Sequence, residues 1–516
     1  MATPESVPNP QIEASSGLTP AGVQSFESTQ DHVLDAVYAL SLLVSVSLWF
    51  IAIRAPLWLD ETGSFWQISE GFWKIPSRQG GLSFPAYSYI LWFFSKILGT
   101  SEIALRIPSV LAMLAAAYFL YRAARELFDR DIAFVTTAVF CVHPIVILQS
   151  IDVRPYACAA LAISVATFLL VRLRHDKSKR TAALLGLSSA FIVYFHFLFA
   201  VILPGLFLCL LALALGRGKA SWKQVGIALL VFALAFSAVI PGLLYMVHTR
   251  STHVFDGPPQ LQDLGWTLAP VCLPYILGAL IFVAAVTRKL DLEKRLDSWS
   301  LLLCTSLGLV PILILYGVSA GTSIHMFTAR HRLVAIPGIA LCWGFLVSRV
   351  NSRLIRLLFC IAVVSTTAYL ALSSPFSHTH GYTWKYALEI AEKSASVDNA
   401  PVLICSDLPE ADYTQMPEGD AAKDNPLFIQ LSYYKLTVPV VGLPRTFNAE
   451  ARRVGSAFVL QAVQNHQRFL ALGYAASYDT LRWLTDMTAE THEVRTLGQP
   501  DEVVVLEFVP RTETSQ

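Results

Sequence analysis

Two adjacent carboxylates, Asp60 and Glu61, follow directly after a long apolar run, with Trp58 and Trp66 on either side of them. Charged groups are costly at membrane depth, so carboxylates at the mouth of an apolar segment indicate a functional site. A carboxylate sheltered from bulk water is a better base, because burial raises its pKa toward neutrality. The pair could therefore take a proton from a hydroxyl group. The alternative is that it is the solvated start of a loop.

A second polar group lies in a short turn, where the sequence D-V-R-P-Y contains Asp152, Arg154 and Tyr156. Asp152 and Arg154 could line the same site as Asp60, or they could form an ion pair that stabilises the turn. His196 stands alone in the sequence Y-F-H-F near the end of a later apolar segment. A lone histidine of this kind is more often a core residue with a satisfied hydrogen bond than a ligand.

Two arginines, Arg330 and Arg332, stand on either side of His331 at the start of another apolar segment. Arginine binds phosphate through two parallel hydrogen bonds and keeps its charge. A carboxylate that accepts a proton and arginines that hold a departing phosphate suit group transfer from a lipid phosphate. The arginines could instead anchor lipid headgroups. A last group carries no complete ligand set and comprises His248, Arg250, His253 and Asp256.

The composition is that of a polytopic membrane protein. Of the 516 residues, 54% are hydrophobic and only 15% are charged, whereas about 25% are charged in a typical soluble domain. The net charge of +1 provides no basic field for nucleic acid. Apart from Cys405, the 8 cysteines lie in apolar segments, and we expect them to pack rather than to form disulfides or bind metal.

Apolar stretches of membrane-spanning length predict about eleven transmembrane helices. They lie near residues 34–53, 103–121, 132–150, 155–171, 182–198, 199–215, 224–247, 267–286, 300–318, 333–349 and 354–373. The first 33 residues are rich in Ser, Pro, Gln and Glu and contain no Lys or Arg, so the sequence predicts a disordered cytoplasmic tail over 1–33. The transmembrane catalytic domain is then expected over 34–375.

Lys and Arg gather in every second connection between the predicted spans. Because cytoplasmic loops carry an excess of these residues, the N-terminus is predicted to be cytoplasmic. All the polar groups described above then fall on the extracytoplasmic side, which favours a single site. The first outer loop, 54–102, contains an apolar stretch at 85–98 that is too short to span and predicts an interfacial or re-entrant helix.

A change of composition near residue 375 predicts a small extracytoplasmic α/β domain over 376–516. We expect a helix over 382–396 and strands over 401–407, 437–443 and 502–509. No glycine signature of nucleotide binding is present in this part of the sequence. A donor whose hydrocarbon tail lies in the bilayer would need no nucleotide pocket.

In three places the sequence resembles the bacterial polytopic glycosyltransferases of the C-type fold, a group that includes protein O-mannosyltransferase and lipid A aminoarabinose transferase relatives. The first is W-L-D-E at 58–61. The second runs from S-E-I-A-L-R-I-P-S-V-L-A at 101–112 to Q-S-I-D-V-R-P-Y-A at 149–157. The third is T-A-R-H-R-L-V-A-I-P-G-I-A at 328–340.

The resemblance implies a polyprenyl-phosphate-linked sugar as donor, chemistry on the extracytoplasmic face and inversion of the anomeric centre. By position, Asp60 would be the base for the acceptor hydroxyl, with Glu61 beside it. Asp152 would orient the acceptor or a divalent metal ion. Because adjacent side chains diverge by about 100° on a helix, Asp60 and Glu61 are not expected to serve the same atom, and Glu61 would support the loop or a metal.

The same resemblance assigns substrate-binding positions. Arg154 and Tyr156 would shape the site, and Arg330 and Arg332 would lie near the donor phosphate. His196 is a further candidate for substrate binding. Some positions depart from the family pattern, such as Asp152 where Glu is more frequent and His331 where Tyr is usual. These departures leave the sugar, the acceptor and any metal open.

The sequence therefore predicts a multi-pass glycosyltransferase of the bacterial plasma (inner) membrane. Its acceptor would be a glycolipid or lipopolysaccharide, a polysaccharide or a protein. The main alternative is a transporter or flippase of lipid-linked sugars, because charges within the membrane also mark substrate paths. Transporters often contain internal repeats with broken helices at matching positions, and the sequence shows no such repeat.

Overall fold

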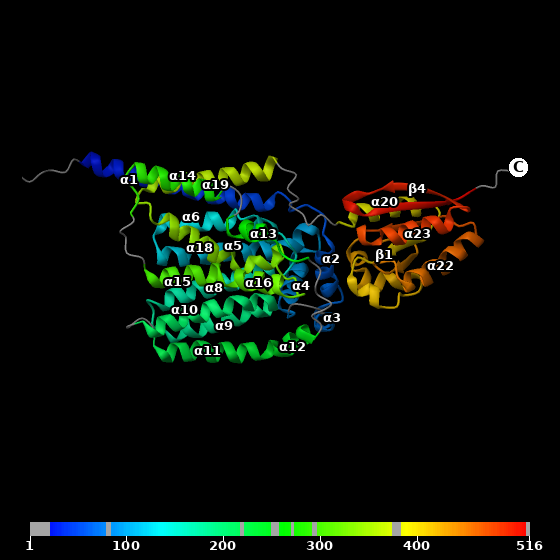
Figure 1. Ribbon diagram of the computed structural model, residues 1–516, viewed down its shortest axis with the longest axis horizontal. Helices are drawn as coiled ribbons and strands as arrows, with labels where there is room; N and C mark the ends of the chain where they lie inside the picture. The colour runs from blue at the N-terminus through cyan, green and yellow to red at the C-terminus, as the bar shows by residue number, and fades with distance from the viewer. Residues whose placement is uncertain are drawn as a thin grey trace, which may run out of the picture.

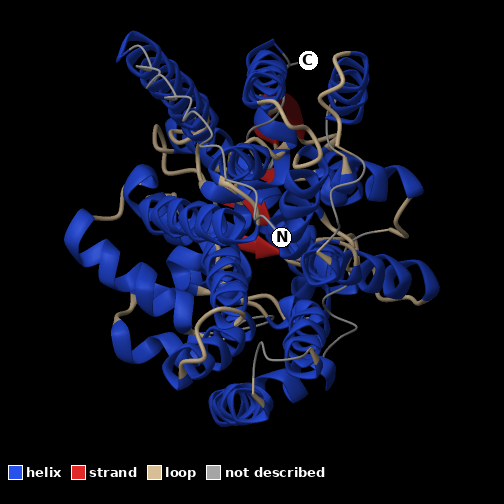
Figure 2. Cartoon of the chain, turned by 90° about the vertical axis from the view of Figure 1, so that its left-hand side faces the viewer, coloured by secondary structure: helices blue, strands red, loops and turns tan. Residues whose placement is uncertain are grey.

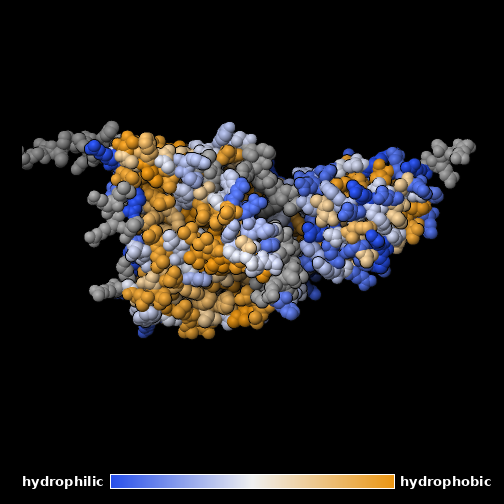
Figure 3. Space-filling view, viewed as in Figure 1, coloured by the Kyte–Doolittle hydropathy of each residue, from blue (hydrophilic) through white to orange (hydrophobic). Residues whose placement is uncertain are grey.

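The computed structural model describes residues 21–78, 84–216, 221–248, 257–269, 273–291, 297–373 and 383–511. A bundle of long helices forms the N-terminal part, and a domain built on a β-sheet is joined to one end of it (Figure 1). Figure 2 looks from the other end of the bundle and shows the strands behind the helices. On the face shown in Figure 3, the side of the bundle is largely hydrophobic and the C-terminal domain is largely hydrophilic, as contact with lipid and with water requires.

Within the described residues, eight helical segments are long and apolar enough to cross a membrane. They are His32–Phe50, Glu102–Leu127 (α5), Tyr156–Leu173 (α8), Phe197–Leu215, Trp222–Tyr245, Ser298–Gly321, Ala329–Val347 and Arg353–Ser373 (α19). Two further pairs of consecutive helices are bent, and counting each pair as one span brings the number to 10. The pairs are α6 (Arg130–Cys141) with α7 (Pro144–Ser150), and α13 (Leu261–Leu268) with α14 (Leu273–Val286). The predicted span at 182–198 corresponds to α9 (Lys179–Phe195), which packs against α8. Every predicted span thus corresponds to a helix or to a helix pair.

Several spans are built from two consecutive helices. The remaining helices of the bundle are α1 (Ala21–Ser47), α10 (Leu203–Leu215), α11 (Trp222–Phe236), α12 (Ile240–His248), α15 (Ser298–Gly308), α16 (Val310–Gly321), α17 (Ala329–Arg332) and α18 (Ile336–Val347). The break between α6 and α7 bends the chain by 69°, where the sequence predicted one continuous span. Pro144 lies at the first turn of α7 and has no N–H to continue the preceding helix.

Helix α1 begins at Ala21, so the described part of the tail that was expected to be disordered is helical from that residue on. Extending an existing helix is much cheaper than nucleating a new one. The apolar run after residue 33 therefore supplies a helix that can be continued toward the N-terminus. Residues 1–20 lie outside the described part of the chain.

Helices α15 and α18 are in backbone contact at two glycines. A Cβ atom on Gly338 would lie 2.2 Å from the carbonyl carbon of Leu307 and 2.4 Å from the nitrogen of Gly308. Small residues let transmembrane helices approach this closely, and the close contact contributes to their association.

Replacing Gly338 with alanine is expected to push α18 away from α15 and to lower the free energy of unfolding by about 1–3 kcal/mol. The measurement is the thermal unfolding temperature of the purified protein in detergent. Gly317→Ala is the matched control, because a Cβ at Gly317 has no neighbour within 4 Å and alanine favours a helix. Equal unfolding temperatures for the two variants would contradict this account of the contact.

Three short helices, α2 (Leu59–Ser69), α3 (Ile75–Arg78) and α4 (Ala86–Leu98), lie between the bundle and the C-terminal domain (Figure 1). Helix α4 coincides with the predicted short helix at 85–98. It has 13 residues, with Pro85 before it and Gly99 at φ 84° after it. A helix of this length does not cross a bilayer.

The C-terminal domain contains a five-stranded sheet in the order β2-β1-β3-β5-β4. The strands are β1 (Val402–Cys405), β2 (Val440–Leu443), β3 (Phe469–Gly473), β4 (His492–Gly498) and β5 (Val504–Pro510). Strand β1 is parallel to β2 and β3, whereas β5 is antiparallel to β3 and β4. The helices are α20 (Lys385–Ala395), α21 (Gln430–Tyr433), α22 (Ala449–Gln464) and α23 (Tyr478–Thr488).

Three strands and one helix of this domain were predicted, and β1, β2, β5 and α20 confirm them. The other two strands were not predicted. Strand β3 is a short, fully buried apolar run, F-L-A-L-G, which periodicity cannot distinguish from a helix segment. Strand β4, at the edge of the sheet, is mostly polar and half-exposed, so it lacks the apolar face that marks a strand.

Candidate active site

Asp60 lies in the first turn of α2, where a negative charge is favoured by the helix dipole. Its Oδ2 atom accepts a hydrogen bond of 2.8 Å from Nη1 of Arg330 and lies 3.7 Å from Nη2 of Arg154. Each of the three side chains is 25% exposed. The site therefore presents one solvent-accessible carboxylate between two guanidinium groups.

The two arginines come from distant parts of the chain. Arg330 belongs to α17, and its guanidinium lies 6.0 Å from the ring centre of Trp58. Arg154 belongs to the turn between α7 and α8, and it also donates to the main-chain oxygen of Asp60 over 3.3 Å. The guanidinium of Arg154 lies 5.9 Å from the ring centre of Tyr156. These contacts hold both guanidinium groups beside Asp60.

Glu61 points in a different direction from Asp60 and is buried. Its carboxylate accepts hydrogen bonds from Nε and Nη2 of Arg106 over 3.1 and 2.7 Å. It also accepts from the main-chain nitrogens of Trp58 and Val153 over 3.2 and 3.0 Å. Adjacent positions on a helix point in different directions, and the two carboxylates diverge as expected. Both carboxylate oxygens of Glu61 are therefore occupied by hydrogen bonds that do not involve Asp60.

Arg106 completes a clamp on the turn before α2. Besides Glu61, its guanidinium donates to the main-chain oxygens of Ile53, Ala55 and Pro56. Arg106 was not predicted as a site residue, although a lone arginine inside the apolar span 103–121 is a signal of such a residue.

Asp152 is buried, and it accepts a hydrogen bond of 3.0 Å from the indole nitrogen of Trp58. Its main-chain oxygen accepts another, of 2.6 Å, from the hydroxyl of Ser109. Since Trp58 in turn lies against Arg330, Asp152 positions the wall of the site. Among the described residues, no group of three or more His, Cys, Asp or Glu side chains is placed to hold a metal ion.

Tyr156 and His196 form a buried aromatic layer beside the arginines. Their ring centres are 5.3 Å apart, and the ring of His196 is 5.2 Å from that of His331. His331 is held by the main-chain oxygen of Met326, 2.9 Å from its Nδ1. This packing brings Tyr156 and His196 to the site as wall residues.

Arg332 points away from Asp60. Its Nη1 atom donates to the main-chain oxygen of Asp263 and to the hydroxyl of Thr267 in α13, over 2.9 Å in both cases. The structure therefore brings Arg330 to the carboxylate but not Arg332. The polar group that began at His248 in the sequence is only partly described. His248 ends α12 and is exposed, and Arg250, His253 and Asp256 lie outside the described residues.

Comparison with known proteins gives a family match over part of the chain and a shared fold. Residues 83–245 match the family model of dolichyl-phosphate-mannose-protein mannosyltransferase, which is less than half of the chain. No curated protein sequence is similar enough to count as a match.

Solved structures of ArnT from Cupriavidus metallidurans share the fold. The apo state has a TM-score of 0.54 at 13% identity, and the structure bound to undecaprenyl phosphate has 0.53 at 11%. Each comparison covers 91% of this chain and 97% of that chain. The archaeal oligosaccharyltransferase AglB from Archaeoglobus fulgidus has a TM-score of 0.49 at 12% identity, over 94% of this chain and 75% of that chain. The chain therefore has the C-type fold of these multi-pass membrane proteins, and its residues 83–245 are similar to a mannosyltransferase family.

Proposed function

We propose that the protein transfers a sugar from a polyprenyl-phosphate-linked donor to a hydroxyl group of an acceptor outside the cytoplasm, with Asp60 as the base. The observation that carries this proposal is the accessible Asp60 carboxylate held between Arg154 and Arg330. The solved relative ArnT has been captured with undecaprenyl phosphate, which supports a lipid phosphate as the ligand of these arginines.

In the proposed reaction, Arg154 and Arg330 bind the donor phosphate and stabilise the charge that develops on it. Asp60, released from its arginine partners, accepts the proton of the acceptor hydroxyl. The acceptor oxygen forms a bond to the anomeric carbon as the bond from that carbon to the phosphate oxygen breaks. Polyprenyl phosphate leaves, and attack opposite the leaving group inverts the anomeric centre.

The other site residues take supporting roles in this proposal. Glu61 and Asp152 hold the turn and Trp58, and so they position Asp60 and Arg330 rather than touch the substrate. Tyr156 and His196 form the wall of the site beside the arginines.

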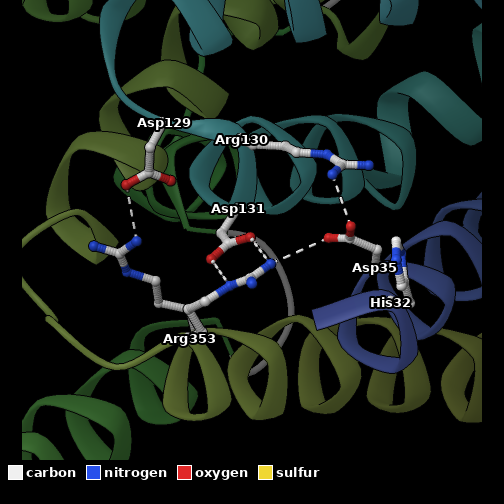
Figure 4. Close-up of a pocket in the computed structure, with 7 residues that line it drawn as sticks. His32, Asp35, Asp129, Arg130, Asp131 and Arg353 are labelled. Carbon is white, nitrogen blue, oxygen red and sulfur yellow. Dashed lines mark hydrogen bonds and ion pairs between the residues drawn. The ribbon is translucent and has the colours of Figure 1, made fainter. Parts of the chain in front are cut away.

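We further propose that the protein lies in a bacterial inner membrane with its N-terminus in the cytoplasm and its C-terminal domain outside. Charged residues in the middle of α1 and at the ends of α6 and α19 that lie away from the C-terminal domain line a cavity of about 700 Å³ (Figure 4). Its ion pairs are Arg353–Asp131, Arg353–Asp35, Arg130–Asp35 and Arg356–Asp129. Arginines at this end agree with a cytoplasmic location, and the pairs tie the three helices together.

The function is tested by following radiolabel from a set of polyprenyl-phosphate sugars into glycolipid, polysaccharide and protein fractions of membranes that contain the wild type. Transfer into one fraction supports the proposal and identifies the acceptor class. The opposite result is that no donor supports transfer while labelled lipid crosses the bilayer of reconstituted vesicles. That result would replace the transferase with a flippase.

Replacing Arg330 with glutamine is expected to weaken binding of undecaprenyl phosphate roughly ten- to a hundredfold, because hydrogen bonds to charged groups contribute this much. Binding is measured by titrating the purified protein in detergent. Arg332→Gln is the control, because that side chain bonds to α13 and not to Asp60. Equal loss of affinity in both variants would contradict the assignment of the phosphate to Arg330.

A further inference from the structure

The C-terminal sheet is joined to the segment that carries Asp60. Thr383, just before α20, forms a β-bridge with Trp58, two residues before Asp60. The hydroxyl of Thr383 also donates to the carboxylate of Asp501, which precedes β5. Because β5 is antiparallel to β3, the residues before β5 lie at the same edge of the sheet as the carboxyl end of β3. That edge therefore faces the membrane domain.

Further contacts hold the two domains in this orientation. The hydroxyl of Tyr434 accepts a hydrogen bond of 2.7 Å from the main-chain nitrogen of Leu57 and donates to Glu102 over 3.0 Å. Glu102 also pairs with Lys385 at 3.0 Å. A Cβ atom on Gly63 of α2 would lie 3.0 Å from a methyl group of Ile429, so the two domains are in close contact along the helix that begins with Asp60.

The edge that faces Asp60 is where a sheet of this topology binds ligands. Strand β1 lies between β2 and β3, and it is parallel to both. From β1 the chain passes first to β2 on one side and then to β3 on the other side. Where the direction of the connections reverses in this way, ligands bind at the carboxyl ends of the strands. Asp407 follows β1, and Arg445 follows β2.

Asp407 and Arg445 are partly exposed, and each lies two residues beyond the end of its strand. The pKa of the Asp407 carboxyl is raised, mainly by burial and also by the charge of Asp60. The indole of Trp384, 3.5 Å away, and the charge of Arg445 act in the opposite direction. Asp407 and Asp60 are thus within electrostatic reach of each other. The Nε atom of Arg445 is buried and has no hydrogen-bond partner among the described residues. An unpaired buried donor is costly, and a ligand that accepts a hydrogen bond would remove this cost.

We propose that Asp407 and Arg445 bind the hydroxyl groups of a saccharide acceptor, so that the C-terminal domain forms the outer wall of the active site. This inference rests on the proposed function, because it places the acceptor opposite the base Asp60. A carboxylate accepts hydrogen bonds from sugar hydroxyls, and a guanidinium donates to them. The pair is neutral as a whole, and Asp407 would repel a phosphate, so a hydroxylated ring fits these residues better than the donor phosphate does.

The test compares Asp407→Asn and Arg445→Gln with the wild type in the full chain. Purified protein receives the polyprenyl-phosphate sugar that supports wild-type transfer, and glycolipid extracted from membranes is titrated as acceptor. We expect each variant to raise the apparent KM for the glycolipid by about tenfold or more. Binding of undecaprenyl phosphate should stay unchanged. Matched controls are Asp486→Asn and Arg482→Gln, whose side chains are exposed on α23.

Each outcome decides the inference. An unchanged KM for glycolipid in both variants overturns it, and so does a loss of undecaprenyl phosphate binding, which would assign the pair to the donor. If Asp407→Asn lowers the thermal unfolding temperature, Arg445→Gln is compared with the more conservative Arg445→Lys instead. The lysine variant is expected to have a KM for the glycolipid between those of the wild type and Arg445→Gln. A wild type that transfers no label overturns the proposed function itself, whereas active wild type with normal variants overturns only this inference.

Discussion

Asparagine in place of Asp60 is expected to slow sugar transfer by about 10²- to 10⁴-fold, the usual contribution of a general base. The amide keeps the shape of the side chain but cannot take up the proton of the acceptor hydroxyl. Arg154 and Arg330 lose the negative charge with which both of them pair. Binding of undecaprenyl phosphate should therefore be retained or strengthened while kcat falls.

The measurement for Asp60→Asn combines the initial rate of label transfer with a titration of undecaprenyl phosphate. Glu70→Gln is a matched control, because Glu70 ends the same helix and its side chain is 54% exposed in a pair with Arg78. Near-normal turnover of Asp60→Asn would show that the base is another group. Loss of both turnover and phosphate binding would show instead that Asp60 organises the arginines.

The second large effect is expected at the buried Glu61–Arg106 pair, whose side chains are 2% and 4% exposed. Removing one partner of a buried ion pair leaves an uncompensated charge and costs about 3–5 kcal/mol. Glu61→Gln should therefore lower the thermal unfolding temperature sharply and reduce the yield of folded protein. Since the pair clamps the turn before α2, transfer should fall together with folding.

The double variant Glu61→Gln with Arg106→Gln distinguishes a positioning role for Glu61 from a catalytic one. Neither residue then leaves a buried charge, so part of the lost stability is expected to return. If Glu61→Gln keeps the wild-type unfolding temperature but abolishes transfer, Glu61 acts on the substrate and the positioning role is wrong.

Much of the membrane part was predictable from the sequence because lipid imposes a local condition on each segment. A span must be apolar over its own length, and a cytoplasmic loop must carry its own Lys and Arg. The spans, the short helix α4 and the change of composition before the C-terminal domain follow from these conditions. The bend of 69° at Pro144 was visible as a proline in the sequence, but its size depends on how α7 packs.

The candidate site could be predicted as a set of residue types but not as a set of contacts. The sequence predicted that Asp60, Arg330 and Arg332 lie on one side of the membrane. It did not indicate which arginine reaches the carboxylate, because residues two apart on a helix point in different directions. Arg330 lies 270 residues from Asp60 in the chain, and only the packing of α17 against the end of the bundle brings them together.

By itself, the sequence determined the fold class, the order of the spans, the strands β1, β2 and β5, and the divergence of Asp60 from Glu61. Only the tertiary structure decided that Glu61 pairs with Arg106, that Asp152 holds Trp58 and that Asp407 and Arg445 lie at the sheet edge that faces Asp60. The physical reason is that hydropathy and helix periodicity act along the chain over one or a few turns. The partner of a buried charge is instead chosen by whichever distant segment packs against it, so it depends on the whole fold.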